Sequence, residues 1–351
     1  MDPDNAVTRT TRTSAPKARS VARGRVLAVE SILAFRVPDT VCDGPLVRVV
    51  SAVNPVTLTP CLPLCLKPMN RCARSCFVAL LAGIACEVGV LAATPLQIRP
   101  VGDRPEGFQR VFDRQVDVFG LAVYATSKVP AAKLLHAAGV LAQYLDNDAD
   151  GKPDNARVIA ALRKSKGLVF MFRTHREFEK IDLHHYIPPR VWNERMTIGL
   201  FAEETLPAGS VRGQFDATLE EVLHLVTAGG YSLAYPEVFG ERPGTRLATA
   251  MDKARGGFFR RVPRRYPPGA WYSYDDRSCD YRCQITEYFY WGLTSLLDAQ
   301  NYPGREQEIR REWKLNTPEK LENGDPLLFR MLTNPQYRFP RKCPDGKYRP
   351  Q

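Results

Sequence analysis

The sequence predicts an α+β domain that is mainly helical and contains a small mixed sheet. Helices are indicated by apolar residues that recur at helical spacing, most clearly between positions 131 and 164. Strands are indicated by two short apolar runs, GLVFMF at 167–172 and MTIGLFAEET at 196–205. The chain has 351 residues, of which 44% are hydrophobic and 25% are charged. This composition supports one large or two small folded domains and argues against global disorder.

The positive charge of the chain does not point to a nucleic-acid partner. The formal net charge is +11, but the excess is scattered and lies partly in the N-terminal stretch. One compact basic patch occurs in the segment RRVPRRYPP. It is formed by Arg260, Arg261, Arg264 and Arg265. A solvated loop and a binding site for an acidic partner are both consistent with this patch.

Residues 69–93 are predicted to form a secretory signal peptide. The chain from Met69 reads MNRCARSCFVALLAGIACEVGVLAATP, with basic residues first, then an apolar run, then small residues before Thr94. We therefore expect cleavage near Ala93 and a secreted, extracellular protein. A membrane anchor is the competing interpretation. Because the apolar run is short for a span and Glu87 interrupts it, we expect no stable anchor.

Residues 1–68 would precede this translocation signal, which makes them unusual. The first 25 residues are rich in Arg, Thr and Ser without an apolar period, and the next forty show no clean helix or strand pattern. We expect this stretch to be a non-native or disordered extension, with translation starting at Met69. An organellar presequence is the alternative, since the segment is arginine-rich.

The region 94–166 is predicted to be helical and to contain a cation-binding loop. Apolar residues spaced from Leu134 to Leu145 predict an amphipathic helix that runs directly into Asp146. The loop then reads Asp-x-Asp-x-Asp-Gly-x-x-Asp from 146 to 154. Oxygens at alternate positions can surround a hard cation if the chain turns sharply at the sixth position, where Gly151 stands.

This loop resembles the calcium loops of EF-hand proteins, and its DGKPDN portion is similar to thrombospondin type 3 loops. The resemblance implies calcium bound by side chains of Asp146, Asp148 and Asp150, by the carbonyl of Lys152, and by Asp154 directly or through water. Arg157 stands at the twelfth position, where an EF-hand has a bidentate glutamate, so affinity should be lower or completed elsewhere. The expected role is to pin two helices together. The alternative is a polar turn capped by Asp154 or Asn155.

The segment Glu220-Glu221-Val222-Leu223-His224 predicts a second metal site. On a helix, residues at i and i+4 share one face, so Glu220 and His224 can hold one ion. Carboxylate oxygen is an acceptable zinc ligand, although it makes the ion's bound water less acidic than histidine does. The alternative is the solvated edge of an amphipathic helix.

With glutamate in place of the first histidine, EExxH resembles the HExxH helix of zincin-like metallopeptidases. The resemblance implies that Glu221 acts as a general base on water. Their gluzincin branch takes its third ligand from a glutamate on a downstream helix, which implies Glu287 here and a zincin-like domain over 167–351. Glu287 is an acid in an aromatic and apolar segment, where it must be paired, protonated or metal-bound. Pairing with an arginine or lysine is the alternative. The implied cofactor is Zn²⁺ or another divalent transition metal.

Several other residues are candidates for roles at this site. A phenol that stabilises an oxyanion could come from Tyr231, Tyr272 or Tyr274, and the sequence does not select among them. His184 and His185 could each complete a site from a loop. Three further expectations are structural: His136 packs on its helix, Gly229-Gly230 ends the EExxH helix, and Cys279 with Cys283 form a short disulfide in an oxidising compartment.

The sequence therefore favours a secreted, metal-dependent hydrolase with a structural calcium site, acting on peptides as the resemblance implies. The different-class alternative is a non-enzymatic secreted calcium-binding protein in which the glutamates form a structural network. The chain also resembles an uncharacterised group of secreted proteins with the same DNDxDG and EExxH features. Neither the substrate nor the oligomeric state follows from the sequence.

Overall fold

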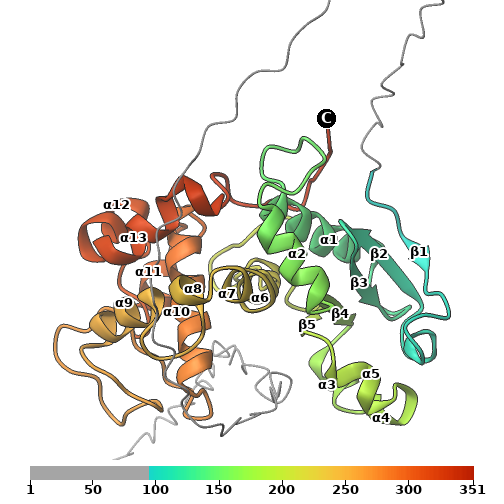
Figure 1. Ribbon diagram of the computed structural model, residues 1–351, viewed down its shortest axis with the longest axis horizontal. Coiled ribbons are helices and arrows are strands. Elements are labelled where there is room, and N and C mark those ends of the chain that lie inside the picture. The colour runs from blue at the N-terminus through green and yellow to red at the C-terminus, as the bar shows by residue number, and fades with distance from the viewer. Residues whose placement is uncertain (1–94) are drawn as a thin grey trace, which may run out of the picture. The chain divides into compact units, whose positions relative to one another are not determined.

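A five-stranded mixed sheet organises the first half of the described chain, which in the computed structural model comprises residues 95–351. The strands lie in the order β1 (Arg99–Pro100), β2 (Arg114–Val118), β3 (Leu121–Ala125), β4 (Leu168–Phe172) and β5 (Thr197–Phe201). The first three pair antiparallel, and β3, β4 and β5 pair parallel (Figure 1). Together with the many helices, this sheet confirms the α+β class.

The two strands expected from apolar runs are present as β4 and β5, and every residue in them is buried. Such continuous burial is typical of parallel strands covered on both faces. The hairpin of β2 and β3 was not predicted. Its turn residues Phe119 and Gly120 both have positive φ, 54° and 83°, which a tight hairpin turn requires. Phenylalanine is a rare choice there, so the usual Asn-Gly signal is missing.

Alternate residues of the sheet enter two separate apolar clusters. Val169 and Met171 of β4 belong to the larger cluster, which includes the helices α1 (Ala131–Leu145) and α6 (Thr218–Leu225). Phe170 and Phe172 face the other side, where an aromatic cluster packs beneath the short helices α3 (His175–Phe178), α4 (Leu183–Tyr186) and α5 (Pro189–Asn193). The sheet is thus a central layer, and α6 packs against β5 and α1.

The two helices around the predicted cation loop are confirmed. Helix α1 ends at Leu145, directly before Asp146, and α2 spans Ala156–Lys164. The Asn155 side chain accepts hydrogen bonds from the N–H groups of Arg157 and Val158, so Asn155, rather than Asp154, is the N-cap of α2.

The expectation that Gly229-Gly230 ends the EExxH helix was wrong. Helix α6 continues as the π-helix η2 (Val226–Tyr231) and then as α7 (Ser232–Ala234). Neither glycine has a positive φ. A Cβ on Gly230 would lie 2.8 Å from Val158, and one on Gly229 would lie 3.1 Å from Met196. The glycines therefore allow close packing against α2 and the adjoining chain, and they do not cap a helix.

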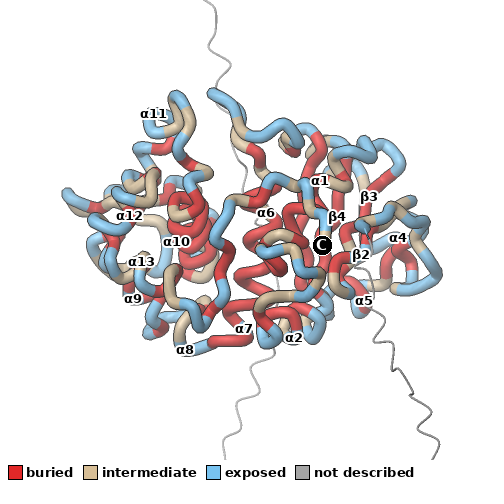
Figure 2. The backbone as a smooth tube through the Cα atoms, turned by 90° about the horizontal axis from the view of Figure 1, so that it is seen from above, coloured by how far each residue is buried: buried red, intermediate tan, exposed pale blue. Residues whose placement is uncertain are grey.

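The second half of the described chain is helical. A long buried helix, α10 (Tyr281–Leu296), contacts α6 on one side and α9 (Arg246–Arg255) and α13 (Pro326–Thr333) on the other. Figure 2 shows buried backbone running along both α6 and α10. The remaining elements are α8 (Pro236–Phe239), α11 (Arg305–Ile309), α12 (Pro318–Gly324) and the 3-10 helices η1 (Phe108–Arg110) and η3 (Pro335–Tyr337).

A disulfide joins Cys279 and Cys283 at the start of α10, as expected. Cys279 precedes the N-cap, Asp280, and so lies outside the regular helix. This removes the geometric difficulty of bridging two cysteines within helical backbone. Beyond η3, residues 338–351 contain no helix or strand and form a C-terminal strap.

The sheet includes strands from both sides of the domain boundary expected between residues 166 and 167. Strand β3 lies in the predicted calcium-loop region and pairs with β4 of the predicted zincin-like region, so the two regions share one sheet. The predicted extension at 1–68 and the signal peptide at 69–93 lie outside the described residues. Within residues 95–351, no helix has both the length and the apolar character needed to cross a membrane.

Candidate metal centre

Helices α6 and α10 bring three of the predicted ligands together. Glu220 and His224 lie one turn apart on α6, and Glu287 lies on the neighbouring α10. Each residue offers one donor atom, and these atoms lie within 4.8 Å of one another. The Nε2 of His224 is 3.8 Å from Oε2 of Glu287. Donors around a tetrahedral ion with bonds of about 2.0–2.2 Å lie roughly 3.3–3.6 Å apart, so small movements would accommodate an ion.

All three side chains are buried, with exposed fractions of 8% for Glu220, 7% for His224 and 6% for Glu287. The Nε2 of His224 has no hydrogen-bond partner within the described part of the chain. An unpaired buried nitrogen is costly, and a bound cation would satisfy it. This unpaired nitrogen and the donor set of two carboxylates and one imidazole fit a divalent transition metal.

The electrostatics of the cluster also favour a cation. Burial raises the pKa of Glu220, and the charge of Glu287 raises it further. Burial likewise raises the pKa of Glu287. Burial alone would lower the pKa of His224, but the carboxylates of Glu287, Glu221 and Glu220 outweigh it and raise that pKa to about 10. All three pKa values are thus raised, so without a metal the side chains of this cluster retain protons. A bound cation could replace these protons as the source of positive charge.

Glu221 lies on the other edge of the imidazole. Its Oε2 is 3.8 Å from Nδ1 of His224, and its side chain is 13% exposed. This position is compatible with a base near the metal. It is equally compatible with a carboxylate that orients the histidine ligand.

Two acidic residues near the centre, Glu204 and Glu312, were not predicted from the sequence. Burial raises the pKa of Glu204 to about 7, and the charge of Glu221 adds to this shift. Burial also raises the pKa of Glu312 to about 7, with further contributions from Asp275 and Glu287. These acids come from segments distant in sequence, and no local pattern marks them.

The structure selects among the three candidate tyrosines. The hydroxyls of Tyr231 and Tyr272 donate to backbone carbonyls, those of Tyr337 at 3.0 Å and Gln284 at 2.8 Å. Tyr274 instead lies beside Glu287, and a hydrogen bond from it favours the charged carboxylate. Of the three, Tyr274 is therefore the phenol beside the candidate ligand Glu287.

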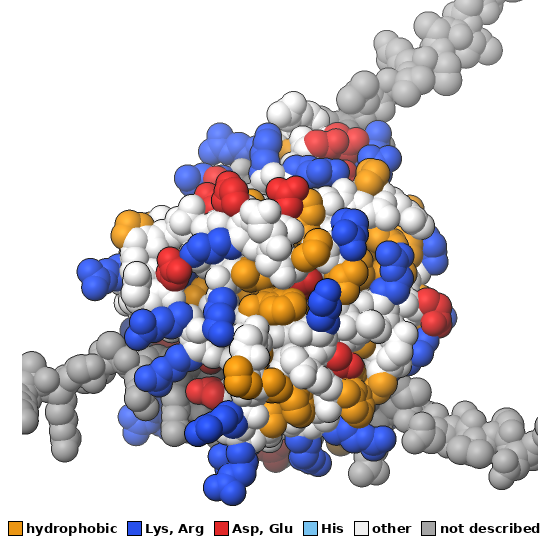
Figure 3. Space-filling view, turned by 90° about the vertical axis from the view of Figure 1, so that its left-hand side faces the viewer, with side chains coloured by type: hydrophobic (Ala, Val, Ile, Leu, Met, Phe, Trp, Pro, Cys, Tyr) orange, Lys and Arg blue, Asp and Glu red, His pale blue; other side chains and the backbone are white. Residues whose placement is uncertain are grey.

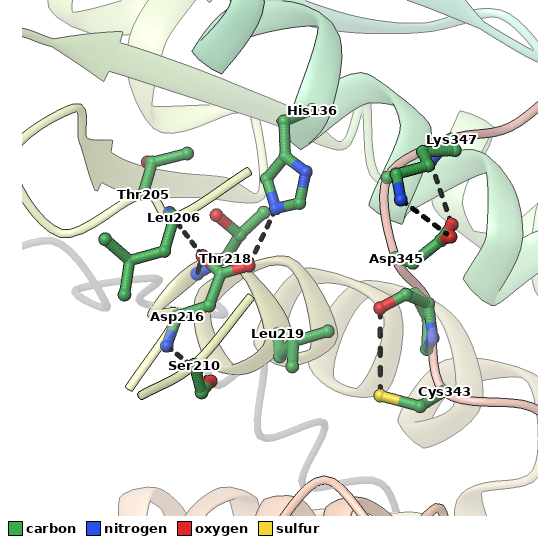
Figure 4. A network of polar contacts seen from close by, with 12 residues as sticks. His136, Thr205, Leu206, Ser210, Asp216, Thr218, Leu219, Cys343, Asp345 and Lys347 are labelled. Atoms are coloured by element: carbon green, nitrogen blue, oxygen red, sulfur yellow. Dashed lines mark hydrogen bonds and ion pairs between the residues drawn. The ribbon is translucent and has the colours of Figure 1, made fainter. Parts of the chain in front are cut away.

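A buried polar network fixes the start of α6 (Figure 4). The Nε2 of His136 on α1 lies 2.7 Å from Oδ2 of Asp216. The other carboxylate oxygen of Asp216 accepts from the N–H groups of Leu206 and Thr218. The expectation that His136 is a packed helical residue is confirmed, since it is 6% exposed. The network holds the EExxH helix against α1 and the chain that leaves β5.

The thiol of the neighbouring Cys343 is poorly suited to act as a nucleophile. Cys343 is outside the disulfide, and burial raises the pKa of its thiol to about 11, with Asp216 adding to the shift. A thiol that stays protonated is a poor nucleophile.

The predicted calcium loop brings three of its aspartates together. One oxygen each from Asp146, Asp148 and Asp154 lies within 4.8 Å of the others. Ala149 and Gly151 both have positive φ, 59° and 84°, which gives the sharp turn that the Asp-Gly pattern anticipated. The carboxylate of Asp150 is outside this group and accepts from the N–H of Lys152 at 2.8 Å.

Two residues beside the loop differ from an EF-hand. The Arg157 side chain points away from it, donating to the carbonyl of Ala234 and lying over the Tyr235 ring. The C-terminal strap lies against the loop, where the Tyr348 hydroxyl donates to Oδ2 of Asp146 at 2.5 Å. A phenol from outside the loop thus contacts one of the three grouped aspartates.

The remaining candidates lie elsewhere. His184 and His185 are exposed on α4 and belong to neither group of metal-ligand side chains found in residues 95–351. The arginines of the basic patch are all exposed. Figure 3 shows the face that carries α9, α12 and α13, where Lys and Arg side chains are spread with few acids between them.

The raised pKa of Glu204 predicts a pH-dependent stability effect. In the folded protein this carboxyl has a pKa of about 7, against 4.5 for the ordinary group. The native state then binds more protons than the unfolded state between these values, so stability falls as pH rises through this window. We expect Glu204→Gln to raise the unfolding temperature at about pH 8 and to leave it unchanged near pH 4. An equal difference at both pH values in thermal scans would contradict this.

The fold and site define an α+β protein with a buried group of metal-ligand side chains between two helices. Comparisons with protein-family models, with curated proteins and with solved structures gave no match. The function is therefore argued from the site itself.

Proposed function

We propose that this protein is a secreted, metal-dependent hydrolase of the metallopeptidase-like type, with a second, structural calcium site. The observation that carries the proposal is the group formed by Glu220, His224 and Glu287, with its unpaired buried Nε2. Structural zinc sites are usually closed by four protein ligands, whereas three protein ligands leave a position for substrate or water. A three-donor group therefore supports a catalytic site over a structural one.

Each residue of the chain has a proposed role. Glu220, His224 and Glu287 would hold the ion, which would supply Lewis acidity for polarising a carbonyl. Glu221 accepts a proton from the attacking water and passes it to the leaving amine. Tyr274 donates a hydrogen bond to the oxygen on which negative charge develops. Glu220 in place of a histidine reduces the net positive charge of the loaded centre, so we expect the reaction to need a higher pH than a two-histidine site.

Elemental analysis of protein expressed from Met69 and secreted tests this proposal. We expect about one zinc or similar ion per chain, lost from the His224→Ala variant because the only nitrogen ligand is gone. His184→Ala is the matched control, since that histidine is exposed on α4. If calcium is the sole metal found, and its content is the same in His224→Ala, the proposal of a hydrolase is wrong.

Calcium binding at the 146–154 loop is expected to stabilise the fold. Ligand at about 100 times its Kd adds about 2.7 kcal/mol to the free energy of unfolding. Weak extracellular sites have Kd values of about 10⁻⁴–10⁻³ M, so about 10 mM calcium should raise the unfolding temperature. Asp148→Ala should abolish that rise, because this exposed carboxylate is in the group of three.

The control for this experiment is Asp103→Ala, which removes an exposed aspartate outside the loop. A calcium response that survives in Asp148→Ala would show that the loop is not the site. The convergence of the loop aspartates also supports the alternative function, a non-enzymatic secreted calcium-binding protein. A calcium response without any transition metal at His224 would favour that alternative.

A further inference from the structure

The side chain of Arg305 packs among aromatic rings near the candidate metal centre. Arg305 is the first residue of α11, and its guanidinium carbon lies 4.4 Å from the centroid of the Phe215 ring. The rings of Trp291 and Tyr302 are each 5.7 Å away. Stacking on aromatic faces holds an arginine side chain in one orientation without neutralising its charge.

A chain of ring contacts connects this arginine to the metal centre. Phe215 packs edge-on against Tyr290, with centroids 6.0 Å apart. Tyr290 in turn packs edge-on against the imidazole of His224, at 5.9 Å. Phe215 and Tyr290 thus link Arg305 to His224 through packed rings.

The guanidinium keeps hydrogen-bonding capacity for another acceptor. Its Nε donates to Oε1 of Gln300 at 2.7 Å. Its ion pair with Glu308 is loose at 3.5 Å, and Glu308 also accepts the N–H of Gly213. An arginine has five N–H donors, so these contacts leave part of the fork unused. The side chain of Arg305 is 11% exposed, so it is not fully enclosed by the protein.

The surrounding side chains add a further unused donor. Trp291 is 5% exposed, and its Nε1 is buried without a hydrogen-bond partner in the described residues. An indole nitrogen can only donate. The contacts around Arg305 therefore combine a positive charge, an unpaired donor and apolar ring faces, which together suit an anion with two acceptor oxygens.

We propose that Arg305 binds a carboxylate of the substrate, so that the hydrolase acts on peptides with an acidic group beside the scissile bond. The carboxylate belongs to an Asp or Glu side chain or to the C-terminus of the peptide. This inference rests on the proposed function for its substrate class. A simple counter-ion for the acidic cluster would pair closely with one glutamate, whereas Arg305 pairs loosely.

The test measures peptide binding by calorimetry to the metal-loaded, full-length secreted protein. Four short peptides are compared: one with a glutamate, its glutamine counterpart, and both with free or amidated C-termini. A charge-assisted contact should make the matching carboxylate peptide bind roughly 10- to 100-fold tighter than its amide. The pair that shows the difference identifies the source of the carboxylate.

Three variants complete the design. Arg305→Gln should remove the preference for the carboxylate peptide, and Arg305→Lys should keep part of it, since lysine retains the charge but lacks the planar fork. Arg310→Gln, an exposed arginine just after α11, is the matched control and should leave the preference unchanged. Because each comparison is made within one protein, a loss of stability does not mimic the result.

The outcomes separate this inference from the proposed function. Equal affinity for acid and amide peptides in the unchanged protein, or a preference that persists in Arg305→Gln, would overturn the inference even if peptides are cleaved. A preference for the carboxylate peptide that depends on Arg305, without any hydrolysis, would support the binding site and contradict the proposed hydrolase function.

Discussion

Replacing Glu221 with glutamine is expected to lower peptide hydrolysis by about 10²- to 10⁴-fold while the bound transition metal stays in place. The substitution keeps the shape of the side chain but removes its ability to accept a proton. Glu221 is outside the group of Glu220, His224 and Glu287, so metal stoichiometry should be unaffected. The measurement pairs the rate of peptide cleavage with elemental analysis of the same sample.

The position of Glu221 gives this experiment a second possible result. Because its carboxylate lies 3.8 Å from Nδ1 of His224, it could orient the ligand instead of acting on water. In that case Glu221→Gln would weaken metal affinity by about 10- to 100-fold, and excess metal would restore the rate. Recovery of the rate with added metal would therefore contradict the role as general base. Glu237→Gln, an exposed acid on α8, is a suitable control.

The Asp216→Ala variant is expected to lose about 3–5 kcal/mol of unfolding free energy. Asp216 is 2% exposed and His136 is 6% exposed, so the histidine would be left without its buried partner. The N–H groups of Leu206 and Thr218 would also lose their acceptor. Urea unfolding in the presence of calcium measures this cost while keeping the 146–154 loop in one state.

Asp216→Asn separates the two contributions. The amide oxygen can still accept from Leu206 and Thr218, so the loss should be smaller than for alanine. The surface pair of Lys166 and Glu194 provides a contrast, because both side chains are more than 40% exposed. Breaking it with Glu194→Ala should leave the free energy of unfolding nearly unchanged. A similarly small change in Asp216→Ala would mean that the network does not hold α6.

Local spacing allowed much of the fold and part of each site to be predicted. The buried strands β4 and β5 came from runs of apolar residues, and α1 and α2 came from the helical period. The cation loop came from aspartates at alternate positions before a glycine. In each case the relevant residues are close in sequence, so backbone geometry alone fixes their relation.

Glu287 shows how far chemical reasoning can extend such local patterns. It was singled out because a carboxylate among aromatic residues must find a partner. The structure places it 3.8 Å from His224, which is 63 positions earlier in the chain. The sequence could state that a partner was needed, but it left open whether that partner was an arginine, a lysine or a metal.

Two errors have the same origin. The glycines at 229 and 230 were assigned to a helix end, whereas they make room for α2. The hairpin of β2 and β3 was missed because Phe119 takes a conformation that the residue type disfavours. In both cases, contacts with neighbouring segments stabilise a local backbone structure that the residue types alone do not favour.

The sequence by itself determined the α+β class, the loop of aspartates and the i, i+4 pair on α6. Only the tertiary structure decided which tyrosine lies beside Glu287, that Asp216 anchors α6 to His136, and that Arg305 stacks on Phe215. The physical reason is how far apart in the sequence the interacting residues are. Spacing along a helix or loop is set by backbone geometry, whereas burial and the charges around a group come from segments that meet only when the chain has packed.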